Sequence, residues 1–229
     1  MDKAEFDRFA DEYSTLHAAN VKISGEKPEY FAEYKIRDIS EISVDGDPVR
    51  LILDFGAGVG GSIPHVRHYF PDASLVCLDV SEKSLEIART RFPGQAEFRA
   101  FDGKRIPLAD DTVDVAFAAC VLHHVPHSEH EALLGELRRV LRQGGRLFVF
   151  EHNPINPLTV RAVNTCPFDE NAVLISAFAM RKAFTNAGFS TVQRRFRLFF
   201  PRSLSWLRPA ERVLTWCGLG AQYCVIGTK

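Results

Sequence analysis

The sequence lacks any paired arrangement of cysteines, since its five cysteines form no recognisable pattern. Their number is odd, and no two of them are separated by only two residues. They are Cys77, Cys120, Cys166, Cys217 and Cys224. A secreted disulfide framework or a structural zinc site would need a paired, closely spaced set of thiols. The cysteines therefore predict neither, and they favour a reducing, cytoplasmic environment.

Long apolar runs and an excess of charge of one sign are also missing. The longest stretch without Asp, Glu, Lys or Arg runs only from Val213 to Thr228 and includes Gly218, Gly220 and Gln222. Because a membrane-spanning helix needs about 20 apolar residues, no transmembrane segment is predicted. Residues 1–5 have no apolar core of the kind found in secretory signals. The formal net charge of −1 gives no basis for non-specific binding of nucleic acid.

Short apolar runs rich in Val, Leu, Ile and Phe return repeatedly along the middle of the chain. They lie at residues 51–53, 75–78, 98–101, 113–119 and 147–150. Apart from Arg99 and Asp114 they are continuously apolar rather than alternating, as strands covered on both faces should be. The segments between them carry helix signals, so the chain is predicted to be an α/β protein with a doubly wound, mostly parallel sheet. The ligand site of such a sheet lies at the carboxyl ends of its strands.

Individual helices and the later strands can also be placed. Ser81 is expected to cap a helix over 82–91, and residues 128–131 fit a capping box for a helix that Gly144 and Gly145 end. A further helix is predicted around 177–187, with strands near 191–199 and 223–227. The apolar spacing in the first 50 residues predicts two helices before the first strand.

The first apolar run leads into a glycine-rich turn, Asp54-Phe55-Gly56-Ala57-Gly58-Val59-Gly60-Gly61. Its glycines permit a tight turn and let a ligand approach bare backbone at a helix N-terminus. Because Gly56, Gly58 and Gly61 also satisfy the dinucleotide-binding fingerprint, the turn alone leaves a nicotinamide-dependent oxidoreductase open. Asp54 would oppose a pyrophosphate, whereas it would favour a ligand that carries an ammonium and a sulfonium group.

Acidic residues follow the next two predicted strands as well. Asp79 follows Gly60 at the spacing along the chain at which a carboxylate accepts hydrogen bonds from ribose hydroxyls. Asp102 and Gly103 follow the third strand, where they could read an adenine edge. Together with Asp54, these acids end three successive strands, and that constellation is more specific than any single motif.

From about Leu51 to Phe150 the chain resembles the class I S-adenosylmethionine-dependent methyltransferases. The resemblance is carried by the DxGxGxG turn, Asp79-Val80, Asp102-Gly103, Val113-Asp114-Val115 before Leu122-His123-His124, and the expected helix stop at Gly145. Residues 6–13, Phe-Asp-Arg-Phe-Ala-Asp-Glu-Tyr, look like the lead-in of small-molecule methyltransferases similar to quinone-biosynthesis enzymes.

This resemblance implies a Rossmann-like, seven-stranded sheet with an inserted antiparallel last strand, an N-terminal helical lid and S-adenosylmethionine as cofactor. The cofactor residues that it implies are Tyr13, Asp54, Gly56, Ala57, Gly58, Asp79, Val80, Asp102, Gly103, Ala118 and Ala119. Tyr13 would close over the cofactor, Asp79 would bind the ribose, and Asp102 the adenine. We expect one domain over 1–229, with the lid at 1–50, the cofactor-binding core at 51–150 and acceptor-side elements and last strands at 151–229.

Candidate catalytic residues follow the fourth and fifth strands. His152 is the preferred general base, with His123 and Glu151 as further candidates. Four histidines lie between 123 and 130, but they lack the cysteine and carboxylate partners of a convincing zinc site. The sequence therefore predicts no metal.

Six arginines lie between residues 194 and 212, against the single acid Glu211. This segment could cap an acceptor pocket, bind an anionic group, rest on an anionic membrane surface, or form the solvated face of a strand. The predicted function is methyl transfer to a small-molecule or lipid-linked acceptor. A nicotinamide-dependent oxidoreductase and a non-catalytic S-adenosylmethionine-binding module are the alternatives. The sequence identifies neither the acceptor, nor the methylated atom, nor the oligomeric state.

Overall fold

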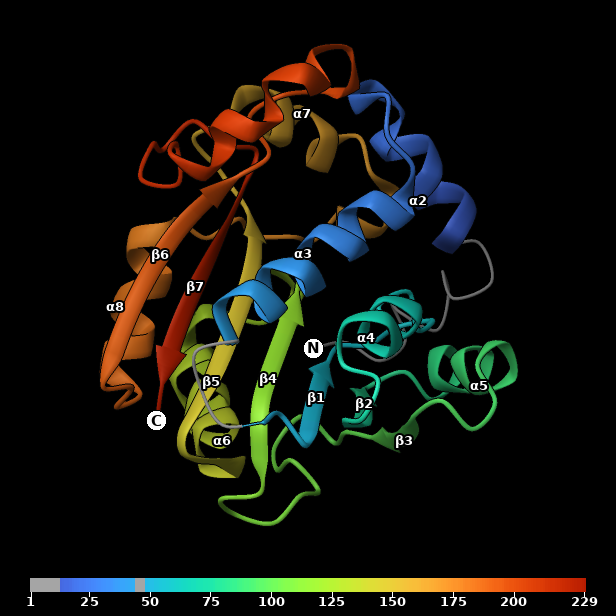
Figure 1. The fold of residues 1–229 in the computed structure, drawn as a ribbon, viewed down its shortest axis with the longest axis vertical. Coiled ribbons are helices and arrows are strands. Elements are labelled where there is room, and N and C mark those ends of the chain that lie inside the picture. The colour runs from blue at the N-terminus through green and yellow to red at the C-terminus, as the bar shows by residue number, and fades with distance from the viewer. Residues whose placement is uncertain (1–12, 44–47) are drawn as a thin grey trace.

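Seven strands form one sheet in the order β3-β2-β1-β4-β5-β7-β6 (Figure 1). The computed structural model describes residues 13–43 and 48–229, with only the backbone of residues 13–15 and Ile23. The strands are β1 (Leu51–Phe55), β2 (Ser74–Asp79), β3 (Glu97–Ala100), β4 (Val113–Ala119), β5 (Leu141–His152), β6 (Thr191–Arg197) and β7 (Gln222–Thr228). Strand β7 is inserted between β5 and β6 and runs antiparallel to both. The predicted seven-stranded, mostly parallel sheet is therefore confirmed.

Helices cover both faces of this sheet (Figure 1). The α-helices are α2 (Tyr13–Val21), α3 (Pro28–Ser43), α4 (Ile63–Tyr69), α5 (Glu82–Arg91), α6 (His130–Val140), α7 (Pro157–Asn164) and α8 (Ala177–Asn186). Shorter 3-10 segments are η1 (Lys22–Ser24), η2 (Leu122–His124), η3 (His127–Glu129), η4 (Pro167–Asp169) and η5 (Arg202–Arg212). Helices α3 and α4 contribute to the apolar cluster on one face, and α6 and α8 to the cluster on the other. The sheet is thus doubly wound, as predicted.

The central strands carry apolar side chains on both faces because successive side chains enter opposite clusters. In β5, Phe148 joins the cluster under α3, whereas Leu147 and Val149 join the cluster under α6. All three side chains are fully buried. Complete burial of each such side chain stabilises the fold by about 1.5–3 kcal/mol.

The ends of the helices agree with the sequence only in part. Helix α5 begins as predicted, since the Ser81 hydroxyl accepts a hydrogen bond from the Ser84 backbone N–H at 3.0 Å. The predicted capping box is wrong, because α6 begins at His130 and its cap residue Glu129 makes no side-chain cap bond. The predicted stop at Gly144 and Gly145 is also wrong, because α6 ends at Val140 and both glycines lie in β5.

Gly145 has a different reason to be glycine. A Cβ atom there would lie 2.8 Å from the Arg142 carbonyl oxygen and 3.0 Å from that of Val113. The register of β4 against β5 shifts at this point, so the backbones approach closely where the strand begins. The residue therefore permits a backbone contact and does not end a helix.

Within the described residues two α-helices, α2 and α3, precede β1, and α3 buries Ile36 and Ile39 of the second predicted helix. The predicted apolar face of residues 6–10 lies outside the described residues. Within 13–43 and 48–229, no helix is both long enough and apolar enough to cross a membrane. The division of the chain at residues 50 and 150 and the cytoplasmic location stay predictions.

Candidate functional site

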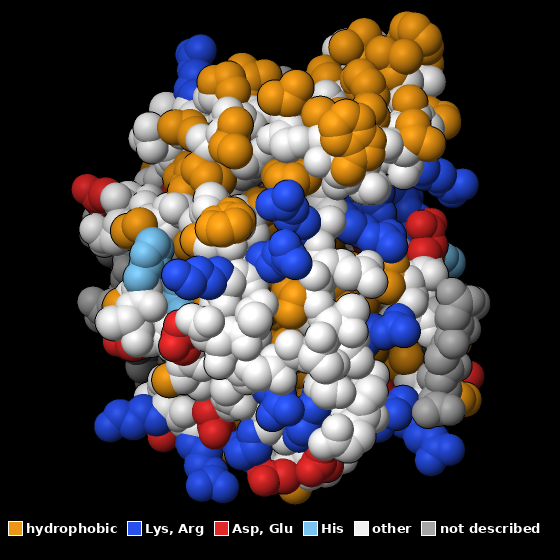
Figure 2. Space-filling model, turned by 90° about the vertical axis from the view of Figure 1, so that its left-hand side faces the viewer, with side chains coloured by type: hydrophobic (Ala, Val, Ile, Leu, Met, Phe, Trp, Pro, Cys, Tyr) orange, Lys and Arg blue, Asp and Glu red, His pale blue; other side chains and the backbone are white. Residues whose placement is uncertain are grey.

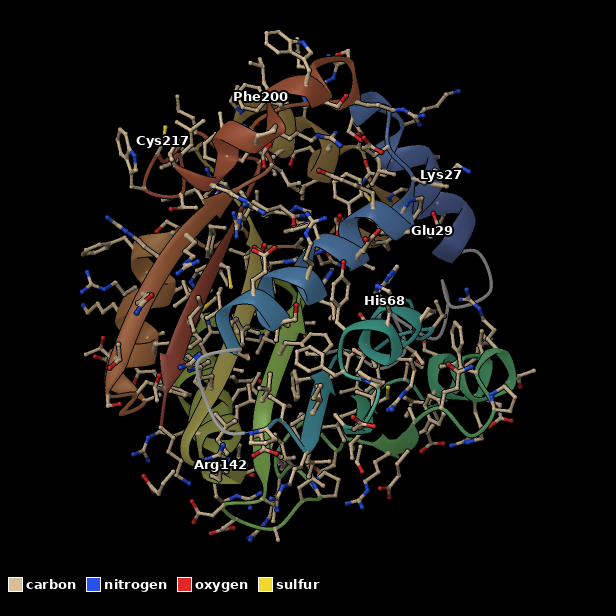
Figure 3. All side chains as sticks on the ribbon, in the orientation of Figure 1. Lys27, Glu29, His68, Arg142, Phe200 and Cys217 are labelled. Atoms are coloured by element: carbon tan, nitrogen blue, oxygen red, sulfur yellow. The ribbon has the colours of Figure 1, made fainter. Side chains whose placement is uncertain are left out.

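A large cavity lies at the carboxyl ends of β1, β2 and β4, where a doubly wound sheet is expected to bind its ligand. Its volume is about 940 Å³, enough for a nucleoside-sized molecule and a second small one. One end is lined by the glycine turn and the β2 end. The other end is lined by α2, α3, α7 and residues 198–201. In Figure 3, Lys27 and Glu29 from the N-terminal segment lie at the same end of the molecule as Phe200, and all three line the cavity.

The glycine turn is shaped by contacts that side chains would prevent. Gly56 has a φ of +77°, and a Cβ atom on it would collide with the side chain of Val121. Its backbone N–H donates to the Leu78 carbonyl oxygen at 2.7 Å, which joins the turn to the end of β2. Gly58 has a φ of +51°, but no described atom lies within 4 Å of a Cβ built there. Gly56 therefore fixes the turn, whereas Gly58 presents open backbone to the cavity.

Two of the predicted acids meet at this turn. The Asp79 carboxylate accepts hydrogen bonds from the backbone N–H groups of Gly58, at 2.7 Å, and Ser81, at 2.9 Å. Asp54 is buried, and its Oδ2 atom has no hydrogen-bond partner among the described residues. Burial, and then the nearby Asp79 charge, raise the pKa of Asp54 to about 8. An unpartnered carboxylate oxygen at the cavity wall fits the ammonium and sulfonium groups of S-adenosylmethionine.

Only some of the remaining predicted cofactor residues line the cavity. Ala57, Val80 and Ala119 line the cavity with the turn. Asp102, Gly103 and Ala118 are not among the described residues that line it, and Phe101 lines it instead. The exposed Asp102 carboxylate accepts hydrogen bonds from the backbone N–H groups of Lys104 and Arg105. Tyr13 is the first residue of α2, but its side chain lies outside the described part of the chain.

The predicted catalytic residues His123 and Glu151 form a buried pair. Nδ1 of His123 lies 2.6 Å from Oε2 of Glu151. The other oxygen, Oε1, accepts hydrogen bonds from the backbone N–H groups of Val121 and Leu122. Burial lowers the pKa of His123, but the Glu151 and Asp169 carboxylates outweigh it and hold that pKa well above its ordinary value. Glu151 is not among the described cavity-lining residues. It therefore contacts His123 and the loop after β4 (residues 120–125, the β4 loop) from the side that faces away from the cavity.

Asp169 is the site residue that sequence reasoning missed. It is buried at the end of η4, and its Oδ1 atom lies 3.5 Å from Nε2 of His123 and 3.4 Å from Nε2 of His124. Burial raises the pKa of Asp169, but the contacts of the two histidine rings outweigh it and hold that pKa below the ordinary range. The residue ends a 3-10 helix of three residues with no motif around it, so no local signal marks it. Only the packing of 166–173 against the β4 loop brings it there.

His152, the preferred general base, also lines the cavity. Its ring centroid lies 5.4 Å from that of His123. Burial, and then the charge of His123, lower the pKa of His152 to about 4. The imidazole is therefore neutral at pH 7 and has an electron pair with which to accept a proton.

The polar residues that follow His152 serve mainly the fold. The Asn153 side-chain amide donates to the carbonyl oxygens of Gly218 and Gly220. The Asn156 side chain caps α7, and its amide donates to the Leu219 carbonyl oxygen. These bonds hold the loop before β7 at the acceptor end of the cavity.

Comparison with known proteins agrees with this geometry. Residues 53–149 match the family model described as a methyltransferase domain. The ubiquinone/menaquinone biosynthesis C-methyltransferase UbiE of Pseudomonas fluorescens (strain Pf0-1) is 32% identical over 124 residues, which cover 51% of this chain and 48% of that protein. The chain therefore spans about half the length of the curated relatives that it matches.

Solved structures extend the likeness of the fold to the whole chain. An S-adenosylmethionine-dependent methyltransferase from Thermotoga maritima covers 99% of each chain with a TM-score of 0.70 and 21% identity. Phosphoethanolamine N-methyltransferase 2 of Haemonchus contortus, solved with S-adenosyl-L-methionine, has a TM-score of 0.68 and 12% identity over 98% of this chain and 60% of that one.

Residues 53–149 are therefore similar to the methyltransferase domain family, and the fold of the whole chain is that of the class I S-adenosylmethionine-dependent methyltransferases. Within this class the chain is similar to the quinone-biosynthesis C-methyltransferases. The resemblance predicted from the glycine turn and the acidic strand ends is confirmed.

Proposed function

We propose that this protein transfers the methyl group of S-adenosylmethionine to a small, partly apolar acceptor. The donor would lie across Gly56, Ala57 and Gly58, with its cationic end toward Asp54 and its ribose toward Asp79. The observation that carries the proposal is the buried, unpartnered Oδ2 atom of Asp54 beside the open backbone of Gly58. A cationic donor would pair its positive charge with the Asp54 carboxylate. The negative charge of a dinucleotide pyrophosphate would instead be repelled by that carboxylate.

The acceptor would occupy the other end of the same cavity. Phe168, Phe199 and Phe200 line that end together with His152. Arg208 closes it, because its guanidinium donates to the Glu26 carboxylate at 2.7 Å and stacks over the Tyr30 ring. Positioning the acceptor atom in line with the methyl group and the sulfur would supply much of the acceleration. We propose His152 as the group that accepts a proton there, with Glu151 positioning His123 beside it.

The end of the molecule above the acceptor cavity is unusually apolar. Figure 2 shows orange side chains gathered at the top of the molecule, with blue ones below them. The described large apolar residues that are exposed come mostly from two segments, 155–158 before and in α7 and 204–219 in and after η5, which lie at this end of the molecule (Figure 1): Ile155, Leu158, Leu204, Trp206, Val213, Trp216 and Leu219. Exposed arginines stand among them at positions 161, 202 and 212.

We propose that this end face rests on an anionic lipid surface. Tryptophan and leucine would enter the interface while the arginines meet lipid phosphates, as in other peripheral proteins. The sequence predicted a membrane contact at 194–212. We now propose residues 155–158 and 202–219 for it, because residues 194–197 lie in β6. An apolar acceptor could then reach the cavity from the lipid without crossing water.

Calorimetric titration tests the proposed donor site. The wild-type protein, freed of bound cofactor, should bind one equivalent of S-adenosylhomocysteine and no NADH. Asp79→Asn should weaken this binding, because it disturbs both the ribose contact and the bond from Gly58. Asp72→Asn is the matched control, since Asp72 is exposed and lies outside the described cavity lining.

Binding of NADH without S-adenosylhomocysteine would overturn the proposed donor and favour the oxidoreductase alternative. Equal affinities of wild type and Asp79→Asn for S-adenosylhomocysteine would show that Asp79 does not bind the ribose. Methyl transfer from labelled S-adenosylmethionine to any acceptor would exclude the non-catalytic alternative.

A further inference from the structure

Three potential metal ligands converge on the wall of the acceptor cavity. They come from His123, His124 and Asp169, each of which offers one ligand atom, and these atoms all lie within 4.8 Å of one another. The histidines come from η2, after β4, whereas the aspartate comes from η4, beyond β5 and α7 in the sequence. All three residues also line the cavity.

The spacing of these atoms suits ligands around an ion better than hydrogen-bond partners. Oδ1 of Asp169 lies 3.5 Å from Nε2 of His123 and 3.4 Å from Nε2 of His124. Good N–H···O hydrogen bonds are shorter, at about 2.7–3.2 Å. Ligands bonded to a tetrahedral zinc ion at about 2.0–2.1 Å lie about 3.3 Å apart. In addition, Nε2 of His123 is buried and has no hydrogen-bond partner among the described residues.

Glu151 supplies the support that metal-binding histidines usually have. Its Oε2 atom lies 2.6 Å from Nδ1 of His123, and Oε1 is fixed by two backbone N–H groups. A carboxylate behind a histidine holds a proton on the rear nitrogen, and an ion bound at the front nitrogen would displace the proton there and take its electron pair. Nδ1 of His123 thus donates to Glu151 while Nε2 faces His124 and Asp169.

Backbone hydrogen bonds hold the two segments that carry the three proposed ligands next to each other. The Val173 N–H donates to the His123 carbonyl oxygen at 2.8 Å, and the Asp169 N–H donates to the Cys166 carbonyl oxygen at 3.1 Å. The segment that carries Asp169 is therefore tied directly to the loop that carries the histidines. Glu151 and Asp169 bring two buried carboxylates to this point, a charge that a divalent cation would balance.

We propose that His123, His124 and Asp169 bind a divalent transition-metal ion of the zinc type. Two imidazoles and one carboxylate would leave coordination positions open for a further ligand, and all three residues line the cavity. The ion would bind an oxygen atom of the acceptor and lower the pKa of a hydroxyl bound to it. This role rests on the proposed methyltransferase function and specifies its acceptor as an oxygen-bearing molecule. It departs from the prediction, made from the sequence, that there is no metal site.

The test is metal binding by the full chain after treatment with a chelator. Wild type should bind one equivalent of Zn²⁺ in calorimetry, and Co²⁺ should give visible d–d absorption without thiolate charge-transfer bands. Asp169→Asn and His124→Gln each remove a ligand and should weaken Zn²⁺ binding at least tenfold. Glu151→Gln keeps the ligands but loses their support, so affinity should fall by roughly 10- to 100-fold. His127→Gln is the matched control, because His127 is exposed and close to His124 in the sequence.

S-adenosylhomocysteine affinity and thermal unfolding of each variant report separately on the donor site and on folding. If wild type binds neither Zn²⁺ nor Co²⁺, or if Asp169→Asn binds them as tightly as wild type, the metal site is refuted. With S-adenosylhomocysteine still bound, the proposed function would stand and the cluster would be a proton-bridged ion pair. Loss of S-adenosylhomocysteine binding by wild type would instead overturn the proposed function itself.

Discussion

The two ends of the cavity are built in different ways. The donor end comes from two consecutive strand ends, with Asp54 and the glycine turn after β1 and Asp79 after β2. The acceptor end combines α2, α3, the β4 loop, α7, η4 and residues 198–201, which are spread over most of the chain. The residues of the donor end therefore lie close together in the sequence and form a motif. The residues of the acceptor end are far apart in the sequence and meet only when the chain has folded. Motifs identify the cofactor for this reason and do not identify the acceptor.

The two ends also differ in charge. At the donor end, Asp54 has a carboxylate oxygen without a described partner, and its raised pKa leaves it to a cationic ligand to stabilise the ionised form. At the acceptor end, Glu151 and Asp169 already face His123 and His124, and Arg208 already faces Glu26. Substitutions at the donor end should act on cofactor binding, and substitutions at the acceptor end should leave it intact.

The largest effect that we expect comes from Gly56→Ala. The new methyl group would collide with Val121 at a φ of +77°. The left-handed backbone costs about 1–2 kcal/mol and overpacking costs about 1–3 kcal/mol more. The midpoint of urea unfolding should therefore fall substantially, and binding of S-adenosylhomocysteine should be lost.

Gly58→Ala is the matched control for this collision. It also has a positive φ, but no described atom lies within 4 Å of the added Cβ. Only the backbone cost of about 1–2 kcal/mol applies to stability, while the methyl group enters the cofactor space. Equal unfolding midpoints for the two variants would show that the collision with Val121 does not lower the stability of Gly56→Ala.

A smaller effect, dependent on pH, is expected from Asp54. Burial raises its pKa from 3.8 to about 8 in the folded protein, so the fold favours the protonated acid. The free energy of unfolding of the ligand-free protein should fall as the pH rises from about 4 to about 8. Affinity for the cationic ligand should rise over the upper part of this range, by up to roughly tenfold per pH unit.

Asp54→Asn should remove both trends, because an amide does not titrate. It should stabilise the ligand-free protein at pH 8 and weaken S-adenosylhomocysteine binding there. Thermal unfolding and calorimetry between pH 6 and pH 8 check the two slopes. If wild type and variant share the same slopes, another group is responsible for them.

The smallest effect is expected at the apolar end face. Trp206 and Trp216 are 73% and 78% exposed, and their replacement by serine should reduce binding to vesicles that contain anionic lipid several-fold. Phe178→Ser is the matched control, because Phe178 is 67% exposed but lies on α8, away from this face. Cosedimentation with vesicles measures the difference, and S-adenosylhomocysteine affinity should stay unchanged. If all three variants bind vesicles as wild type does, the end face does not contact lipid.

The sequence by itself determined the order of strands and helices, the glycine turn and the donor-end acids. Continuous apolar runs predict buried parallel strands, and the glycines and Asp79 follow those strands at fixed short distances. Both signals depend on neighbouring residues and the periodicity of local structure. The start of α5 at Ser81 was predictable for the same reason, since the N-cap bond joins residues of a single helical turn.

Only the tertiary structure decided the rest. Gly144 and Gly145 predict a helix stop, but strand pairing with β4 and β7 draws residues 141–146 into β5. Asp102 follows its strand like the other acids, yet it turns away from the cavity to accept bonds from its own loop. Asp169 reaches His123 and His124 through a contact between loops that lie far apart in the sequence. Such contacts are selected by burial and charge compensation in the packed chain, and no spacing along the sequence encodes them.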